Sequence, residues 1–370
     1  IVESISRYES AEDGGRVENE TATSAGAEQL TLNIIKRGEM RKKNYDPVPD
    51  IIYGLAPKGV GMLNALSTCG KTTFALGMAL SAAAGKAFLN LYPGGKPVKV
   101  LALLLENEED HWSANDQTKI ETELGLTAEH KALVDENFAA VYGNLLGEEY
   151  DGDDDNLLTS PNVMKALERE IKSGGYQLVI IDTMSQAFAL EKENDNGQVR
   201  KLALKPLRAA AQRTGCAFLV LHHVGKVTED STGHAINQAR GASAINNDAN
   251  AVYLLKPVGS LTKGGDRFAN LVFAKARRPD KPDETPIKLA AGSRVFTLCN
   301  QTEAESVKER TGAEKFADFV KECRQIKSID AVKDFVAKLK AAGDDKSDRT
   351  VEGGNRQLWM PGLFTKLATS

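Results

Sequence analysis

The most regular feature of the sequence is an alternation of short apolar runs with longer amphipathic stretches. Four mainly apolar runs are typical of strands: 61–66, 98–105, 177–182 and 216–222. Three stretches between them have apolar residues at helical spacing: about 71–85, 160–173 and 198–213. Strands that are apolar on both faces belong in a parallel sheet covered by helices on both sides. The pattern therefore predicts an α/β fold with a mainly parallel central sheet.

A second series of strand-like segments follows, separated by the short turns GSLTKGGD and AAGS. They are 250–255, 269–275, 286–290 and 294–299. We expect them to extend the same sheet as antiparallel hairpins. Residues 1–28 carry seven acidic and two basic side chains without an apolar period, which is typical of a flexible linker. The pattern thus divides the chain into this linker, an α/β domain over 29–300, and a C-terminal part over 301–370.

The C-terminal part is charged and has apolar residues at helical spacing, followed by a polar stretch and an apolar ending. Two interpretations stay open for 301–370: a small winged-helix-like module, or a helical cap on the main domain. The segment 148–155, EEYDGDDD, is predicted to be a solvated acidic loop rather than a calcium site.

Composition narrows the class of protein. Hydrophobic residues at 41% and charged residues at 26% are ordinary for a globular chain. The net charge of −4 argues against a protein that coats nucleic acid by bulk charge, although a local basic channel stays compatible with it. The four cysteines lie far apart, without the spacing of a zinc site or a disulfide framework.

Cellular location is predicted from the same features. Four widely spaced cysteines without a disulfide pattern are typical of a reducing cytoplasm. No apolar stretch approaches the roughly 20 residues that are needed to cross a bilayer. We therefore expect a cytoplasmic protein without a membrane partner. The first residue is Ile1 rather than Met, which suggests an excised or processed fragment with an upstream domain.

The strongest chemical signal is ALSTCGKTT, residues 65–73, between a predicted strand and a predicted helix. It matches a permissive form of the phosphate loop, with Ala65 where Gly is commoner. Gly70 lets backbone N–H groups turn toward phosphates, and the helix start adds its positive end. Lys71 is predicted to reach the β and γ phosphates of ATP, and the Thr72 hydroxyl to bind Mg²⁺. The predicted nucleotide-binding residues are Ala65, Ser67, Thr68, Cys69, Gly70, Lys71, Thr72 and Thr73.

Two carboxylates at strand ends complete the predicted hydrolytic site. Asp182 ends the apolar run QLVIID, so it should face the crevice at the carboxyl edge of a parallel sheet and hold Mg²⁺. Glu106 ends the run LALLLE and is our candidate for activating water. Glu108 and Glu109 compete for that role, and Glu106 is favoured because it comes first after the strand.

The strand 216–222 ends at two adjacent histidines, His222 and His223. Because side chains alternate along a strand, only one of them faces the site, and His223 is the candidate sensor of the γ phosphate. The polar segment 226–249 that follows has few apolar anchors, which is typical of a functional loop.

The chain resembles the RepA-type hexameric replicative helicases of plasmids and phages, a branch of the RecA-like ATPases. The resemblance covers roughly residues 45–299. It rests on six motifs in order: ALSTCGKTT, LLLENEED, LVIIDTMSQAF followed by ENDNG, LVLHHVGK, RGASAINNDAN, and a strand ending KARR. The chain departs from the family at Ala65, in place of glycine, and at Asn107, where the family often has Asp.

The resemblance implies a RecA-like P-loop fold and an ATP-dependent DNA helicase that acts as a ring. Arg240 resembles the arginine finger that reaches into the neighbouring subunit's ATP site, and Lys275 with Arg277 is similar to a second trans-acting pair. The implied partners are single-stranded DNA, further copies of the chain as a hexamer, and an upstream primase or initiator domain. Basic residues for the DNA channel are sought at Lys226, in the loop to Gln238, and at Lys263.

Three other functions share part of this pattern. A RecA- or KaiC-like ATPase could act as a recombination mediator or regulatory switch, with the same nucleotide residues and no strand displacement. A nucleotide-sensing adaptor would bind ATP with negligible hydrolysis, and Asn107 is the feature that favours it. A metabolic P-loop kinase is disfavoured, because Arg240, Lys275 and Arg277 would then need another purpose.

Overall fold

A computed structural model describes the central part of the chain: residues 34–43, 48–107, 109, 116–146, 157–191, 195–223, 248–258, 265–276, 278 and 284–306. The chain divides into two units, 1–47 and 48–370. The first contains the short helix α1 (Arg37–Lys42). The linker 1–28, the acidic loop 148–155 and residues 307–370 lie outside the described residues, so their predicted roles are untested.

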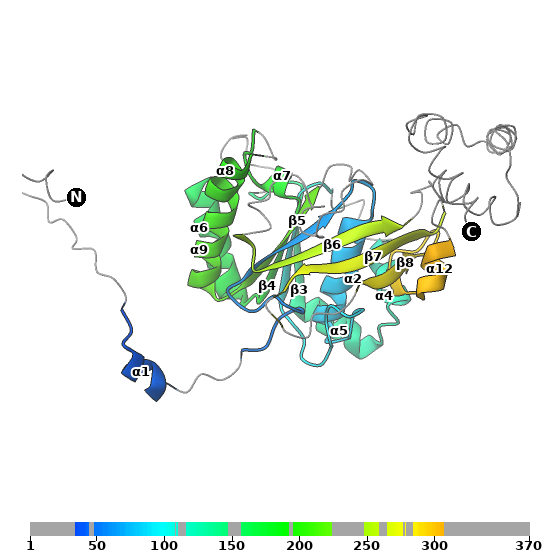
Figure 1. Ribbon diagram of the computed structural model, residues 1–370, viewed down its shortest axis with the longest axis horizontal. Helices are drawn as coiled ribbons and strands as arrows, with labels where there is room; N and C mark the ends of the chain where they lie inside the picture. Colours follow the sequence, from blue (N-terminus) through cyan, green and yellow to red (C-terminus); the bar gives the residue numbers. More distant parts are fainter. Residues whose placement is uncertain are drawn as a thin grey trace, which may run out of the picture. The chain divides into compact units, whose positions relative to one another are not determined.

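The described strands of the second unit form one sheet with the order β3-β2-β4-β5-β1-β6-β7-β8-β9 (Figure 1). The strands are β1 (Val60–Ala65), β2 (Val100–Leu104), β3 (Phe138–Tyr142), β4 (Leu178–Asp182), β5 (Ala217–His223), β6 (Ala251–Val258), β7 (Arg267–Lys275), β8 (Thr285–Leu289) and β9 (Thr297–Leu298). Neighbours from β3 to β6 are parallel, and those from β6 to β9 are antiparallel. The predicted α/β fold with its antiparallel extension is confirmed.

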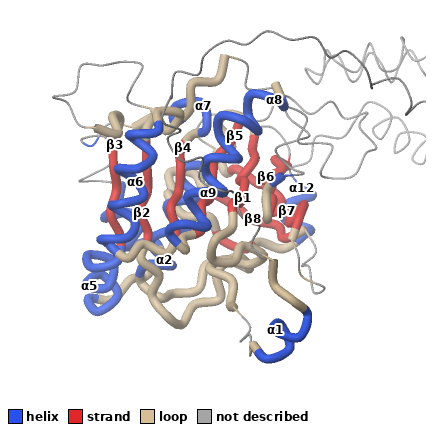
Figure 2. The backbone as a smooth tube through the Cα atoms, turned by 90° about the vertical axis from the view of Figure 1, so that its left-hand side faces the viewer, coloured by secondary structure: helices blue, strands red, loops and turns tan. Residues whose placement is uncertain are grey.

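Helices cover both faces of the sheet, and alternate residues of each strand pack against them. On β4, Leu178 and Ile180 face the side of α2 (Lys71–Ala83) and α5 (Ala128–Asn137). The intervening Val179 and Ile181 face the other side. That side is covered by α6 (Pro161–Gly174), α7 (Met184–Ala187), the π-helical turn η2 (Val199–Leu204) and α9 (Lys205–Thr214). Figure 2 shows α6 and α9 over this face.

The structure adds three elements between 106 and 159 that the hydrophobic pattern did not predict. They are α4 (Asp116–Glu123), α5 and β3. α4 buries only Ile120, and every residue of β3 is half-buried, so neither has a strong apolar period. α5 is defined at its start instead by Thr127, whose hydroxyl accepts a hydrogen bond from the His130 backbone N–H.

Two predicted elements differ in detail. The helix expected over 198–213 is divided into α8 (Asn196–Gln198), η2 and α9, and Pro206 is the second residue of α9. The strand expected over 294–299 is reduced to the two exposed residues of β9, at the edge of the sheet. A short helix, α12 (Gln301–Ser306), follows.

Candidate functional site

The phosphate loop connects the end of β1 to the start of α2, as the sequence predicts. Gly70 caps α2 with a left-handed backbone, φ 87°, and Thr68 is also left-handed at φ 66°. A Cβ at Gly70 would lie 3.2 Å from the ring of Phe296, so both the backbone and the available space favour glycine here. Ser67 and Thr68 are exposed at the mouth of the loop, whereas Cys69 is buried beneath it. The N-terminus of α2 is thereby left open to an anion.

Strand register brings the other predicted residues to the same end of the sheet. Leu104, the last residue of β2, pairs with Asp182, and Ala65, the last residue of β1, pairs with His223. Asp182 and His223 follow the strand positions whose side chains pack on the α2 side, so both point toward the phosphate loop. Glu106 lies two residues beyond the end of β2 at this edge.

Lys71 lies at the centre of the cluster. Its Nζ is 2.7 Å from Nδ1 of His223 and donates to the carbonyl of Leu66 at 3.3 Å. Burial of the ammonium lowers the pKa of Lys71, and the negative charges of Asp182 and Glu106 oppose this effect. Because an ammonium only donates, Nδ1 of His223 accepts, which leaves the proton of a neutral ring on Nε2.

Thr72 and Asp182 form the pair that suits a magnesium ion. The Thr72 hydroxyl donates to Oδ2 of Asp182 at 2.6 Å. The other carboxylate oxygen, Oδ1, is buried and has no hydrogen-bond partner among the described residues. Burial raises the pKa of Asp182 to about 6, and the nearby charge of Glu106 adds to the rise. A buried carboxylate oxygen that has no donor is suited to a hard cation, so these residues fit Mg²⁺ beside a nucleotide.

Glu106 faces the same cluster. Its Oε1 accepts a hydrogen bond from the Thr183 hydroxyl at 2.8 Å and lies 3.6 Å from Nε2 of His223. Its side chain is 35% exposed, so water can reach it. The competing Glu109 lies instead near Tyr142 of β3, where its charge adds to the effect of burial in raising the pKa of that phenol. Glu108 is outside the described residues.

His222 points away from this cluster. It is 3% exposed, and its Nε2 has no hydrogen-bond partner among the described residues. Burial lowers the pKa of His222 to about 4, so the ring is neutral at physiological pH. The two adjacent histidines therefore occupy different environments, and His223 is the one that contacts Lys71.

Of the residues implied by the family resemblance, the described Lys275 does not join this cluster. Lys275 pairs with Val252 near the start of β6, at the end of the strands opposite the phosphate loop. Its Nζ donates to the carbonyl of Ala249 at 2.7 Å. Arg240 and Arg277 are outside the described residues, as are Lys226, Gln238 and Lys263.

Sequence reasoning missed two residues of the site. Thr183 directly follows Asp182 and is 1% exposed, and its place after a strand-ending carboxylate was the available signal. Arg267, at the start of β7, donates from a guanidinium N–H to the Thr68 carbonyl at 3.2 Å. It reaches the loop only because β7 lies two strands from β1, which no local motif reveals.

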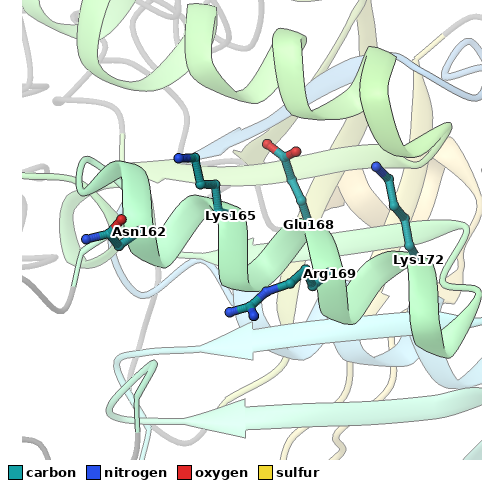
Figure 3. A pocket seen from close by; sticks show the side chains of 5 residues that line it. All are labelled: Asn162, Lys165, Glu168, Arg169 and Lys172. Carbon is teal, nitrogen blue, oxygen red and sulfur yellow. The ribbon is translucent and has the colours of Figure 1, made fainter.

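A surface pocket of about 600 Å³ lies along α6, apart from the phosphate loop. Figure 3 shows Lys165, Glu168 and Lys172 rising from this helix toward its neighbour. Glu168 accepts two hydrogen bonds from Arg213 of α9, and this ion pair links α6 to α9.

The described residues contain no group of three or more His, Cys, Asp or Glu arranged to hold a metal. None of the described helices is long and apolar enough to span a membrane.

A strand, a glycine-containing loop and a helix that presents Lys71 and Thr72 beside Asp182 define a P-loop nucleotide-binding protein. Comparison with family models gives the narrower assignment: residues 38–229 match the AAA domain family AAA_25, and the chain belongs to this family. The chain is therefore a P-loop ATPase domain with a RecA-like fold, which confirms this part of the resemblance.

Comparison with solved structures gives a distant match. A KaiC-like protein from the hyperthermophilic archaeon Pyrococcus horikoshii OT3 is 15% identical, with a TM-score of 0.44, over 69% of this chain and all of the other. A comparison with curated proteins found no match.

Proposed function

We propose that this chain is an ATP-driven motor that assembles into a ring, translocates on single-stranded DNA and unwinds duplex during replication of a plasmid or phage. The observation that carries the proposal is the division of the cationic residues. Lys71 lies within the phosphate-loop cluster, whereas Lys275 of the same subunit lies at the opposite end of the strands. If Lys275 serves a nucleotide, that nucleotide is bound by a neighbouring subunit, which is the arrangement that we propose for the ring.

The proposed hydrolysis uses the residues around Lys71. ATP draws the Lys71 ammonium away from His223 toward the β and γ phosphates, and this frees Nδ1 of His223. Glu106 takes a proton from the attacking water as the water oxygen bonds to the γ phosphorus and the bridging oxygen leaves with ADP. Thr72 and Asp182 would hold Mg²⁺, whose charge offsets that of the phosphates. The freed His223 then reports γ-phosphate loss by hydrogen bonding.

The neighbouring subunit completes the proposed site. Arg240 would stabilise the charge that develops on the γ phosphate, with Lys275 and Arg277 as the second trans-acting pair. Release of Lys275 from the Ala249 carbonyl would accompany its engagement across the interface. Basic side chains at Lys226 and Lys263 would track the DNA backbone inside the ring, and an upstream primase or initiator domain would direct loading.

The deciding experiment is unwinding of a forked DNA by the purified chain with Mg²⁺ and ATP, together with its native mass. We expect a hexamer-sized assembly, hydrolysis stimulated by single-stranded DNA, and strand displacement that Lys71→Ala abolishes. DNA binding should weaken steeply with salt, since each phosphate contact releases counterions. Lys226→Ala should weaken DNA binding without changing ATP affinity.

Other outcomes identify the alternative functions. DNA-stimulated hydrolysis without strand displacement would point to a recombination mediator or a regulatory switch. ATP binding with negligible turnover, whether or not single-stranded DNA is present, would point to a nucleotide-sensing adaptor, which Asn107 favours. Absence of any DNA binding would exclude the motor.

A further inference from the structure

The further inference concerns Thr183 and Ser185, two hydroxyl residues to which nothing above gives a role. Thr183 follows Asp182 at the end of β4, and Ser185 lies in α7. Thr183 is 1% exposed, and Ser185 is half-buried. The Thr183 hydroxyl is 2.8 Å from Oε1 of Glu106 and 2.9 Å from the Ser185 hydroxyl. Because Leu104 pairs with Asp182 across β2 and β4, Thr183 is held beside the segment that carries Glu106.

The direction of these hydrogen bonds follows from counting protons. An ionised carboxylate only accepts, so the single Thr183 hydroxyl proton is directed to Glu106. Ser185 must then be the donor to Thr183 Oγ1. The result is a chain from Ser185 through Thr183 to Glu106, in which each bond polarises the next.

This series of hydrogen bonds leaves one carboxylate oxygen of Glu106 available to take a proton from water. The Thr183 hydroxyl lies 2.8 Å from Oε1 of Glu106, and Nε2 of His223 lies 3.6 Å from the same oxygen. No described residue hydrogen-bonds to Oε2. A glutamate side chain has three rotatable bonds, and fixing one oxygen removes most of this freedom. Since a general base must lie within hydrogen-bond reach of the proton that it takes, the fixed rotamer determines whether Oε2 meets the water.

We propose that Thr183, supported by Ser185, is a positioning residue that holds Oε1 of Glu106 so that Oε2 faces the attacking water. This inference rests on the proposed function, because it takes Glu106 to be the base. Thr183 is almost fully buried and its hydroxyl is directed to Glu106, so we expect it to act on the rate of hydrolysis and not on the binding of ATP.

The test compares Thr183→Val, which keeps the shape but removes the hydroxyl, with Thr183→Ser, which keeps the hydroxyl. We expect Thr183→Val to lower kcat by about tenfold to a hundredfold with KM for ATP within about twofold of the parent chain. Thr183→Ser should retain kcat within about threefold. Thr285→Val, which changes a buried threonine on β8, is the matched control and should leave both constants unchanged.

A double-mutant cycle with Glu106→Gln separates positioning from a structural role. If Thr183 acts through Glu106, then Thr183→Val should cause no further loss of the single-turnover rate in the Glu106→Gln background. An additive loss, a rise in KM, or failure of serine to restore kcat would overturn the inference. If the valine variant does not fold, as judged by circular dichroism, Thr183→Ala takes its place in the cycle.

Failure of the inference and failure of the proposed function are distinguishable. Loss of hydrolysis in Glu106→Gln with normal kcat in Thr183→Val rejects only the positioning role. Normal hydrolysis in Glu106→Gln rejects Glu106 as the base, and the role of Thr183 is rejected with it.

Discussion

At the residue scale, the cluster around Lys71 shows how neighbours determine the chemistry of each group. Lys71 and His223 contact one another, whereas Asp182 keeps one buried oxygen without a described partner. Each of these groups would change partners when a nucleotide binds. In the cluster, the charged side chains therefore contact one another, and the phosphates of a nucleotide with Mg²⁺ can replace these contacts.

Replacing Glu106 should separate binding from hydrolysis. Glu106→Gln keeps the side-chain volume but removes the group that accepts a proton, so we expect ATP affinity within about twofold and a fall in kcat of about 10²- to 10⁴-fold. Isothermal titration and a phosphate-release assay measure the two quantities. Glu109→Gln is the matched control and should hydrolyse ATP normally. Normal turnover in Glu106→Gln with loss in Glu108→Gln would move the base to position 108.

The affinity for Mg²⁺ with nucleotide should depend on the protonation of Asp182. Burial raises the pKa of this carboxyl to about 6 from an ordinary value of 3.8. Its stabilising contribution to the fold is therefore complete below about pH 4 and is lost as the pH rises through about 6. Binding a cation requires the ionised form, so affinity should fall about tenfold for each pH unit below 6.

Titration calorimetry between pH 5 and 7.5 measures this dependence. Asp182→Asn is the control, because its amide cannot titrate, and we expect it to bind Mg²⁺ with nucleotide more weakly. The difference between the two pH profiles isolates the carboxyl from the titration of the phosphates. Parallel profiles would assign the pH dependence to the nucleotide alone.

At the element scale, the turn from β1 into α2 depends on the backbone of one residue. Gly70 has φ 87°, and its α carbon faces the ring of Phe296. We expect Gly70→Ala to destabilise the chain by about 1–2 kcal/mol and to weaken ATP binding at least about tenfold, since a left-handed backbone disfavours a Cβ. Thermal melting and titration with ATP measure the two effects.

Gly215 supplies a matched control for this prediction. It ends α9 with φ 82°, and a Cβ there would meet nothing within 4 Å. Gly215→Ala carries a similar backbone penalty far from the phosphate loop, so it should lower stability and leave ATP affinity unchanged. Equal affinity losses in both variants would show that the effect comes from stability rather than from the loop.

At the scale of the whole molecule, the proposed role of Arg240 as an arginine finger requires an active site that lies between subunits. Arg240→Ala should bind ATP nearly normally, still assemble, and lose hydrolysis by about 10³- to 10⁵-fold. Adding inactive Lys71→Ala subunits should partly restore activity, because some mixed interfaces pair an intact phosphate loop with an intact finger. Phosphate release from mixtures of the two variants measures the recovery. Full hydrolysis by a dilute monomer, or no recovery despite demonstrated subunit exchange, would place Arg240 in cis or outside the site.

Local patterns in the sequence determined the architecture and the main residues of the site. Apolar runs predicted every described strand except β3, and helical periods predicted α2, α6 and the stretch from α8 to α9, because these periods arise within single elements. The phosphate loop and the strand-ending carboxylates Glu106 and Asp182 were likewise visible, since their chemistry depends on position within one strand and one turn. The weakly periodic α4, α5 and β3 were not visible, because they bury few apolar residues at a regular spacing.

Tertiary structure alone decided which of these residues meet. Alternation allowed either His222 or His223 to face the site, and the packing of β5 against the α2 side selected His223. Only the pairing of β2 with β4 places Thr183 against Glu106, and only the antiparallel course of β7 puts Arg267 and Lys275 at opposite ends of the sheet. Lateral neighbours in a sheet come from segments far apart in the chain, so their contacts depend on strand order and register, which no local pattern encodes.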